Sequence, residues 1–341
     1  MTDQPFAQTL AAATGTCGLS AEAAEDAFTR MMTGELTPAQ MGGLLMAMRT
    51  RGETAAEITG AVRAMRAQMT TVDAPEGAVD TCGTGGDGAG TYNISTAAAL
   101  VAAACGVPVA KHGNRAQSSS TGAADVLEAL GVDVEAGPEP MARALRECGT
   151  CFLLAPVHHP AMRHVAPVRK ELGTRTVFNL LGPLANPARV RRQVVGVFAP
   201  EWVEPMAHVL NNLGHEHAWV VHGADGLDEL STTGPNRVAE VRGGAVRTFT
   251  LTPEDAGLTR TTLDHLRGGD REVNAGAIRG LLRGERGPFR DIVLLAAGTA
   301  LVVADHAATI SGGVAQAAAA VDDGRATRVL ERFRAITTEA A

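Results

Sequence analysis

The sequence is poor in aromatic residues and has no long apolar run. Phe, Trp and Tyr together make up 3% of its 341 residues, which disfavours a large aromatic interface. The longest apolar stretches, near residues 94–105 and 292–304, are too short to span a bilayer. The first ten residues lack the basic and apolar regions of a secretory signal. These absences predict a cytoplasmic protein that does not bind membranes.

Blocks of one charge sign and a cysteine framework are also missing. The net charge is −7 and is spread along the chain, so a nucleic-acid-binding surface is not expected. Five scattered cysteines give an odd number without a disulfide framework. Cys148 and Cys151 form a single C-x-x-C pair, which cannot complete a four-ligand zinc site and is more typical of two small core residues.

The chain is instead rich in glycine, and five glycines cluster between residues 83 and 90. The missing side chains let backbone N–H groups approach a bound anion closely. An apolar run at 94–105 follows and is predicted to be a buried helix. Its free N-terminal amides and positive dipole end lie beside Ser95 and Thr96, which predicts an anion site at this turn.

A second polar cluster follows a short predicted strand at 107–110. That strand delivers Lys111, His112, Asn114 and Arg115 to its carboxyl end, where open α/β sheets bind ligands. A run of hydroxyl residues at 118–121 then precedes another helix start. Both loops are therefore suited to phosphate.

Other interpretations of the glycine turn stay open at this point. Gly83, Gly85 and Gly88 satisfy the G-x-G-x-x-G pattern of dinucleotide-binding enzymes. That fold needs an acidic residue about 20 positions further on, whereas here the next strand ends in Lys111. The loop also lacks the Gly-Lys-Ser/Thr ending of a P-loop. A nicotinamide-dependent oxidoreductase and a glycine turn without a ligand are the alternatives.

The remaining patterns predict an α/β protein with a small all-helical domain and a larger α/β domain around a central, largely parallel sheet. Only helical patterns occur at the start of the chain, with an N-cap at Ser20 and capping boxes at Thr37 and Thr54. From about Val79, short strands alternate with helices. Strands are expected at 78–82, 107–110, 132–135, 150–155, 193–198 and 218–222, with a hairpin at 237–251 that turns at 243–244. Later helices are expected at 140–147, 161–172, 276–284, 289–304, 311–321 and 324–337.

Several longer motifs occur in a fixed order. They are GTGGD at 83–87, NIST at 93–96, KHGNRxxSS at 111–119, GxADVLEALG at 122–131, RKELGTRTVFNLLGPLANP at 169–187 and HGADGLDE at 222–229. Together they closely resemble the anthranilate phosphoribosyltransferase family, and the resemblance covers nearly the whole chain. Departures are mild: Tyr92 stands where Phe is frequent and Ala123 where Ser is frequent.

The resemblance implies an enzyme of tryptophan synthesis that transfers a phosphoribosyl group from phosphoribosyl pyrophosphate to the amine of anthranilate. It also implies two domains with the ligands in the cleft between them. Residues 1–72 with about 160–187 would form the helical domain, which carries the interface of a homodimer. Residues 73–159 with about 188–341 would form the α/β domain, which binds the donor.

The resemblance also assigns roles to residues. Donor binding is expected at Gly83, Gly86, Asp87, Thr91, Asn93, Ile94, Ser95, Thr96, Lys111, His112, Gly113, Asn114, Arg115, Ser118, Ser119 and Ala123. Acceptor binding is expected at Gly83, Asn114, Arg169, His112 and His159, and metal binding at Ser95, Asp228 and Glu229, for magnesium and two ions. His215 and His217 are expected to be structural.

Elementary chemistry agrees with part of this assignment. Adjacent carboxylates at Asp228 and Glu229, in a loop after a strand, suit a hard cation such as Mg²⁺, although two solvated loop acids would look the same. The aromatic amine is already neutral, so no acid or base catalyst is expected. Lys111, Asn114 and Arg169 would act by positioning the substrates.

Two related functions compete with the transferase. One is a pyrimidine nucleoside phosphorylase, which shares the two-domain layout, and the other is a non-catalytic relative that binds nucleic acid. The KHGN motif, Arg169 and the acidic pair favour the transferase. The acidic balance of the chain argues against nucleic acid.

Overall fold

A computed structural model describes residues 6–116 and 121–339. The predicted donor residues Ser118 and Ser119 therefore lie outside the described residues. The chain begins with the helices α1 (Phe6–Thr14), α2 (Ala21–Met32), α3 (Pro38–Arg51) and α4 (Ala55–Ala67). Ser20 accepts a hydrogen bond from the Ala23 N–H, and capping boxes form at Thr37 and Thr54. All three predicted helix starts are confirmed.

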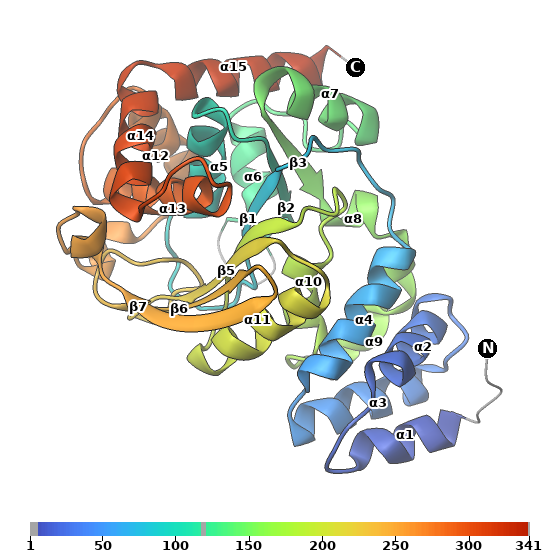
Figure 1. Cartoon of the computed structure of the whole chain (residues 1–341). Helices are drawn as coiled ribbons and strands as arrows, with labels where there is room; N and C mark the ends of the chain where they lie inside the picture. The colour runs from blue at the N-terminus through green and yellow to red at the C-terminus, as the bar shows by residue number, and fades with distance from the viewer. Residues whose placement is uncertain (1–5, 117–120, 340–341) are drawn as a thin grey trace.

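One sheet of seven strands organises the rest of the chain, in the order β3-β2-β1-β4-β5-β6-β7 (Figure 1). The pairs among the first five are parallel, whereas β6 and β7 form an antiparallel hairpin. The predicted sheet and hairpin are confirmed. The strands are β1 (Val79–Gly83), β2 (Val109–Gly113), β3 (Thr150–Leu154), β4 (Arg192–Gly196), β5 (His217–His222), β6 (Asn236–Arg242) and β7 (Ala245–Leu251).

The strand predicted at 132–135 is wrong. Val132 and Val134 are buried and alternate with more exposed acids, which imitates the period of a strand. However, the N–H of Asp133 bonds to the Thr337 hydroxyl at 3.2 Å, and the N–H of Glu135 bonds to the Asp133 carboxylate at 2.9 Å. Since side chains satisfy these amides, the segment forms a turn against the last helix.

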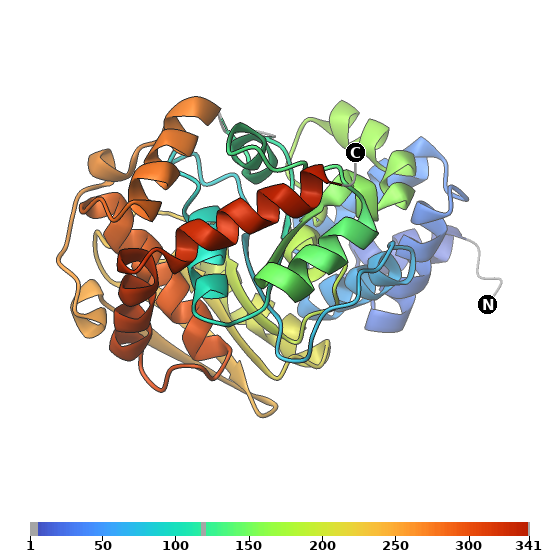
Figure 2. The ribbon, with the colours of Figure 1, turned by 90° about the horizontal axis from the view of Figure 1, so that it is seen from above.

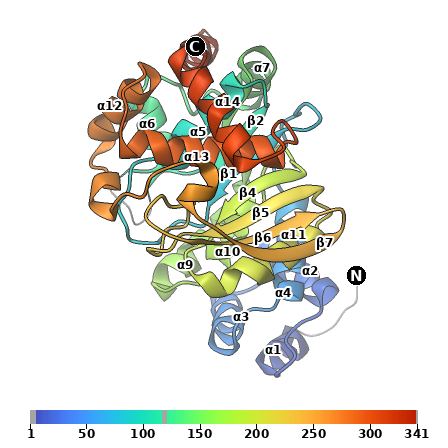
Figure 3. The ribbon, with the colours of Figure 1, turned by 60° about the vertical axis from the view of Figure 1, so that its left-hand side comes forward.

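Two layers of helices cover the sheet (Figures 2 and 3). Helices α5 and α13 pack on β1, and α7 and α15 pack on β3. On the other face, α11 packs on β5 to β7 and α10 on β2. These helices and their neighbours are α5 (Ile94–Ala104), α6 (Ala123–Ala129), α7 (Pro138–Cys148), α8 (Ala155–His158), α10 (Phe178–Leu184), α11 (Val203–Asn212), α12 (Arg271–Leu282), α13 (Pro288–Val303), α14 (Ile310–Asp322) and α15 (Arg325–Thr338).

The middle of the chain returns to the N-terminal helices. The single helix predicted at 161–172 is instead a 3₁₀ turn, Pro160–His164, followed by α9 (Ala166–Leu172). Pro167 has no N–H to continue the first turn, which accounts for the break. Helix α9 packs on α3, and α10 packs on α4. These contacts support the predicted division of the chain, whose boundaries stay a prediction.

The N-terminal helices share one apolar core with the α11 face of the sheet. That core contains Phe28 of α2, Val168 of α9, Leu181 of α10 and Val220 of β5. The methionines at 31, 32, 41 and 48 are buried in it, so they are core residues of this chain. Among the described helices, none is long and apolar enough to cross a membrane.

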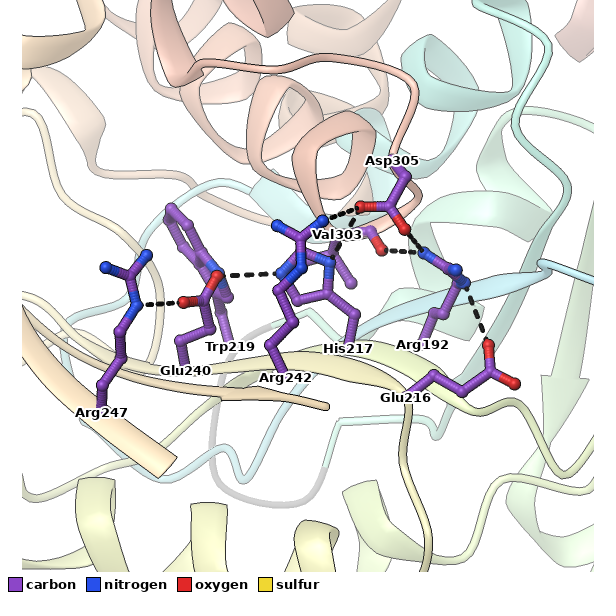
Figure 4. A network of polar contacts seen from close by, with 9 residues as sticks. All are labelled: Arg192, Glu216, His217, Trp219, Glu240, Arg242, Arg247, Val303 and Asp305. Atoms are coloured by element: carbon purple, nitrogen blue, oxygen red, sulfur yellow. Dashed lines mark hydrogen bonds and ion pairs between the residues drawn. The ribbon is translucent and has the colours of Figure 1, made fainter. Parts of the chain in front are cut away.

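The amino ends of the parallel strands carry a compensated polar network (Figure 4). Asp305, just after α13, binds Arg192 of β4 at 2.6 Å and Arg242 of β6 at 2.9 Å. Arg192 also donates to the Val303 carbonyl at 2.8 Å. The network therefore fixes the end of α13 to the sheet.

Glu240 lies at the buried side of this network. Its carboxylate accepts hydrogen bonds from His217 Nε2 and Trp219 Nε1, both at 3.0 Å, and from Arg247. His215 is buried as well and contacts the Leu210 carbonyl at 3.0 Å. Both His215 and His217 thus make the structural contacts that were expected.

Candidate active site

The predicted site residues follow strands whose order reverses at β1. The chain proceeds from β1 to β2 and β3 on one side, and then places β4 and β5 on the other. In open α/β sheets, ligands bind at such a switch point, beyond the carboxyl ends of the strands. The glycine loop after β1, residues 111–115 at the end of β2 and the loop after β5 all lie at this edge.

The glycine loop has a backbone that requires glycine. Gly85, Gly86 and Gly88 have φ of +69°, +79° and +74°, in the left-handed region that side chains disfavour. The loop is anchored at Thr84, whose N–H donates to the Gly196 carbonyl at 2.9 Å and whose Oγ1 accepts from the Phe198 N–H at 3.0 Å. Its amides are therefore held above the ends of β1 and β4.

Two glycines, Gly83 and Gly196, make room for Asp228 of the acidic pair. A Cβ on Gly83 would lie 2.3 Å from Asp228 Oδ2, and a Cβ on Gly196 would lie 1.5 Å from the Asp228 carbonyl oxygen. Asp228 Oδ2 accepts the Gly85 N–H at 2.5 Å. Gly83 thus has a packing role that sequence reasoning missed.

Glu229 occupies the N-terminus of α5. Its Oε1 accepts the Ser95 N–H at 3.2 Å, as helix N-termini favour for a carboxylate. The buried Lys111 donates from Nζ to Ser95 Oγ at 3.1 Å and to the Thr81 carbonyl at 2.5 Å. The structure therefore brings together Ser95, Glu229 and Lys111, with Asp228 adjacent.

Charge in this group is poorly balanced. Burial raises the pKa of the Asp228 carboxyl well above its usual range, and the neighbouring Glu229 and Asp87 raise it further. Burial also raises the pKa of Glu229, although Lys111 opposes that shift. A hard cation would relieve this repulsion, and the oxygen donors suit one. Over 6–116 and 121–339, however, no group of three or more His, Cys, Asp or Glu is arranged to hold a metal, so other ligands would be needed.

The buried carboxylate of Asp80, in β1, lies between β1 and β2 beneath the site. Asp80 Oδ1 accepts the His112 N–H at 3.1 Å, while Oδ2 accepts from Asn186 at 2.8 Å and Gln193 at 3.1 Å. β1 and β2 accordingly share a single register pair, against five for β1 and β4. Sequence reasoning missed Asp80, although an acid inside the apolar strand VDTCG was a signal.

Two histidines come together on the other side of the site. The rings of His112 and His159 lie 5.1 Å apart, and His112 Nδ1 is 3.1 Å from the Gly182 carbonyl. Burial lowers the pKa of His159 to about 4, with a smaller contribution from His158, and also lowers that of His112. Among the described residues, the buried Nε2 of His112 has no hydrogen-bond partner. Burial therefore favours the neutral form of both imidazoles, and within the described residues both rings have buried nitrogens without a hydrogen-bond partner.

Arg169 lies in the last turn of α9 and is half-buried. Its guanidinium carbon is 5.2 Å from the Phe178 ring centroid, and burial lowers its pKa. Within the described part of the chain it forms no salt bridge. An uncompensated guanidinium of this kind can bind a carboxylate in a bidentate manner.

Other predicted donor residues are held by the protein itself. Arg115 binds Glu128 at 2.7 Å and Glu135 at 2.7 Å, so its contact with a donor stays a prediction. Asn93 accepts from Asn274 at 2.9 Å, and Asn114 Oδ1 accepts the Arg115 N–H at 2.8 Å. Thr96 is buried and lines a small cavity together with Leu127 and Phe333.

The remaining predicted residues are placed by the backbone. Thr91 forms an isolated bridge to Arg267, Ile94 begins α5 in the core, Ala123 begins α6, and a Cβ on Gly113 would lie 2.7 Å from Phe152.

Comparison with known proteins identifies the class first. Residues 75–327 match the a/b domain of a glycosyl transferase family, and residues 10–69 match the helical bundle domain of that family. The two matches cover most of the chain and define a two-domain glycosyl transferase.

Individual relatives narrow the class. An anthranilate phosphoribosyltransferase of Paramagnetospirillum magneticum is 60% identical over 319 residues, 94% of this chain and 92% of that one. The crystal structure of the enzyme of that name from Thermus thermophilus matches with a TM-score of 0.92 and 50% identity, over 97% of this chain and 99% of that one. The Saccharomyces cerevisiae enzyme in complex with PRPP and Mg matches with a TM-score of 0.90 and 27% identity, over 99% of each chain. The chain therefore belongs to the anthranilate phosphoribosyltransferase family.

Proposed function

We infer that the protein transfers the 5-phosphoribosyl group of phosphoribosyl pyrophosphate to the amine of anthranilate, with release of pyrophosphate, in tryptophan biosynthesis. The observation that carries this inference is the meeting of the glycine loop, Lys111 and the Asp228 and Glu229 pair at one sheet edge, in a chain that matches enzymes of this activity over more than nine-tenths of its length. The same relatives support the transferase over a nucleoside phosphorylase or a nucleic-acid-binding protein.

The donor binds at the glycine loop. Backbone amides and the N-terminus of α5 suit the pyrophosphate, and Lys111 adds a positive charge beside Ser95. As the bond from the sugar carbon to pyrophosphate breaks, the carbon becomes electron-poor and the leaving group gains charge. Preorganised donors at the leaving group lower the barrier to this step.

Magnesium is the proposed cofactor, and two ions are proposed. Ser95, Asp228 and Glu229 would hold it, supported by their clustering and by the repulsion between the two carboxylates. A yeast relative that contains Mg together with PRPP adds support. When bound, Mg²⁺ neutralises charge on pyrophosphate oxygens.

The acceptor binds between the glycine loop and α9. Arg169 pairs with the benzoate carboxylate, and Asn114, His112 and His159 complete the pocket. The neutral imidazoles favour a neutral aromatic amine as their neighbour. No side chain acts as a general base, because the amine lone pair is free at physiological pH. Positioning therefore supplies much of the rate.

One assay tests the reaction. Anthranilate fluorescence should fall when the protein, phosphoribosyl pyrophosphate and Mg²⁺ are all present, and it should stay constant when any one is omitted. Thymidine with phosphate should give no thymine. Phosphorolysis of thymidine without loss of anthranilate would overturn the inference.

The predicted domains and homodimer belong to the same proposal. Residues 1–72 with about 160–187 would form the dimerisation domain, supported by the packing of α9 and α10 on α3 and α4. Sedimentation equilibrium should give twice the 35.1 kDa chain mass. A single-chain mass at micromolar concentration would contradict the dimer.

A further inference from the structure

Arg175 connects the two halves of the site. It lies in the segment between α9, which carries Arg169, and α10. Its Nη2 donates a hydrogen bond to the carbonyl of Gly86, in the glycine loop. Its guanidinium carbon is 4.1 Å from the ring centroid of Phe198, just after β4. One side chain thus spans from the acceptor side to the donor loop.

The contact is specific to arginine. A planar guanidinium can stack on a ring and still donate from its edge, which an ammonium cannot do. Over residues 6–116 and 121–339, Arg175 has no carboxylate within ion-pair distance, so ring and carbonyl are what hold it. It leaves further N–H donors unused, because an arginine has five.

Gly86 is the glycine-loop partner of this contact. With φ of +79°, it belongs to a glycine-rich loop, and glycine tolerates more backbone conformations than other residues do. A Cβ there would lie 3.1 Å from Arg175 Nη2, so the guanidinium packs directly on the loop backbone. The N–H of Phe198 is bonded to Thr84 Oγ1 at 3.0 Å, which ties the stacked ring to the base of the same loop.

We propose that Arg175 is a positioning residue that couples the donor subsite to the acceptor subsite. A pyrophosphate group that orders the glycine loop also fixes the Gly86 carbonyl, and through Arg175 it fixes the segment that follows Arg169. Each ligand then strengthens binding of the other by the same factor, as linkage requires. This inference depends on the proposed function.

The test measures that factor. Anthranilate binding to the full chain is titrated by fluorescence, with and without magnesium pyrophosphate, in the wild type, Arg175→Ala and Arg175→Lys. Pyrophosphate should tighten anthranilate binding about fivefold in the wild type. Both variants should lose this effect, with KM for both substrates raised about tenfold and kcat within about threefold.

A matched variant separates positioning from folding. Arg30 stacks on Phe6 at 5.6 Å in the N-terminal helices, so Arg30→Ala removes a similar contact away from the site and should leave the coupling intact. Coupling retained in Arg175→Ala, or absent from an active wild type, would overturn the inference. A wild type without transferase activity would instead overturn the proposed function.

Discussion

In the part of the chain that the structure describes, charged side chains are paired at one end of the sheet and left without partners of opposite charge at the other. At the amino ends of the parallel strands, Glu240 and Asp305 each contact several N–H donors, so the charge of each carboxylate is compensated (Figure 4). At the carboxyl ends, burial raises the pKa of both Asp228 and Glu229, Glu229 raises that of Asp228 further, and Arg169 has no carboxylate partner within the described residues. The same residue types thus stabilise the fold at one end and stay uncompensated at the other, where we propose that the ligands bind.

Neutralising Asp228 and Glu229 is the strongest test of the difference between the two ends of the sheet. Asp228→Asn with Glu229→Gln keeps oxygen acceptors for the Gly85 and Ser95 amides but removes both charges. We expect turnover at limiting Mg²⁺ to fall roughly 1,000-fold, about 4 kcal/mol, because the leaving group loses its counter-charge. The melting temperature should stay the same or rise, because repulsion is relieved. Initial rates and thermal melts measure both.

The exposed Asp264 gives the control for this double variant. Its side chain is 82% exposed, and Asp264→Asn should change neither turnover nor melting. A double variant with normal turnover at limiting Mg²⁺, or one that melts several degrees lower, would show that the acids are structural.

At the amino ends of the strands, we expect a substitution to lower stability and to leave turnover unchanged. Glu240→Ala leaves the buried donors of His217 and Trp219 without their acceptor. We expect the free energy of unfolding to fall by about 3 kcal/mol, while kcat of the folded enzyme is unchanged. Urea denaturation and steady-state rates measure the two quantities. Glu216→Ala removes a 42% exposed member of the same network and should cost less than about 1 kcal/mol.

This contrast also separates what the sequence predicted from what it did not. The glycine loop, Lys111 and the acidic pair were predictable because they lie at the ends of strands, or just after them, at the same edge of a parallel sheet. Asp80 was not, since its role depends on Asn186 and Gln193, which lie more than 100 residues away. The strand predicted at 132–135 was wrong because buried and more exposed side chains alternate there although no neighbouring strand of the described chain pairs with the segment. Arg175 lay inside a recognised motif, but only the fold places it against Gly86.

Acid should weaken the functional end through His159. Its pKa is about 4 in the folded chain against 6.5 when unfolded, chiefly because burial disfavours the charged ring, with His158 adding to this. Stability is therefore complete above pH 6.5 and falls as pH drops toward 4. At pH 5 the loss due to His159 is about 2 kcal/mol.

Substitution tests this pH dependence. His159→Asn should reduce the fall in unfolding free energy between pH 7.5 and pH 5 by about 2 kcal/mol, measured by urea denaturation. His208→Asn alters a histidine whose side chain is 51% exposed and should leave the slope unchanged. Equal slopes in wild type and His159→Asn would mean that this ring titrates normally.

The smallest expected effect is that of replacing Arg169, whose guanidinium has no carboxylate partner within the described residues. Arg169→Gln should raise KM for anthranilate about tenfold, equivalent to about 1.4 kcal/mol, because one charge-assisted pair with the carboxylate is lost. The melting temperature should change by no more than a few degrees, since the stack on Phe178 is lost but no salt bridge of the described chain is broken. The exposed Arg163, six residues earlier, provides the control, and Arg163→Gln should leave KM unaltered. If Arg169→Gln instead lowered kcat at unchanged KM, the arginine would act on the transition state rather than on acceptor binding, and the charge left free at this end of the sheet would serve a different step.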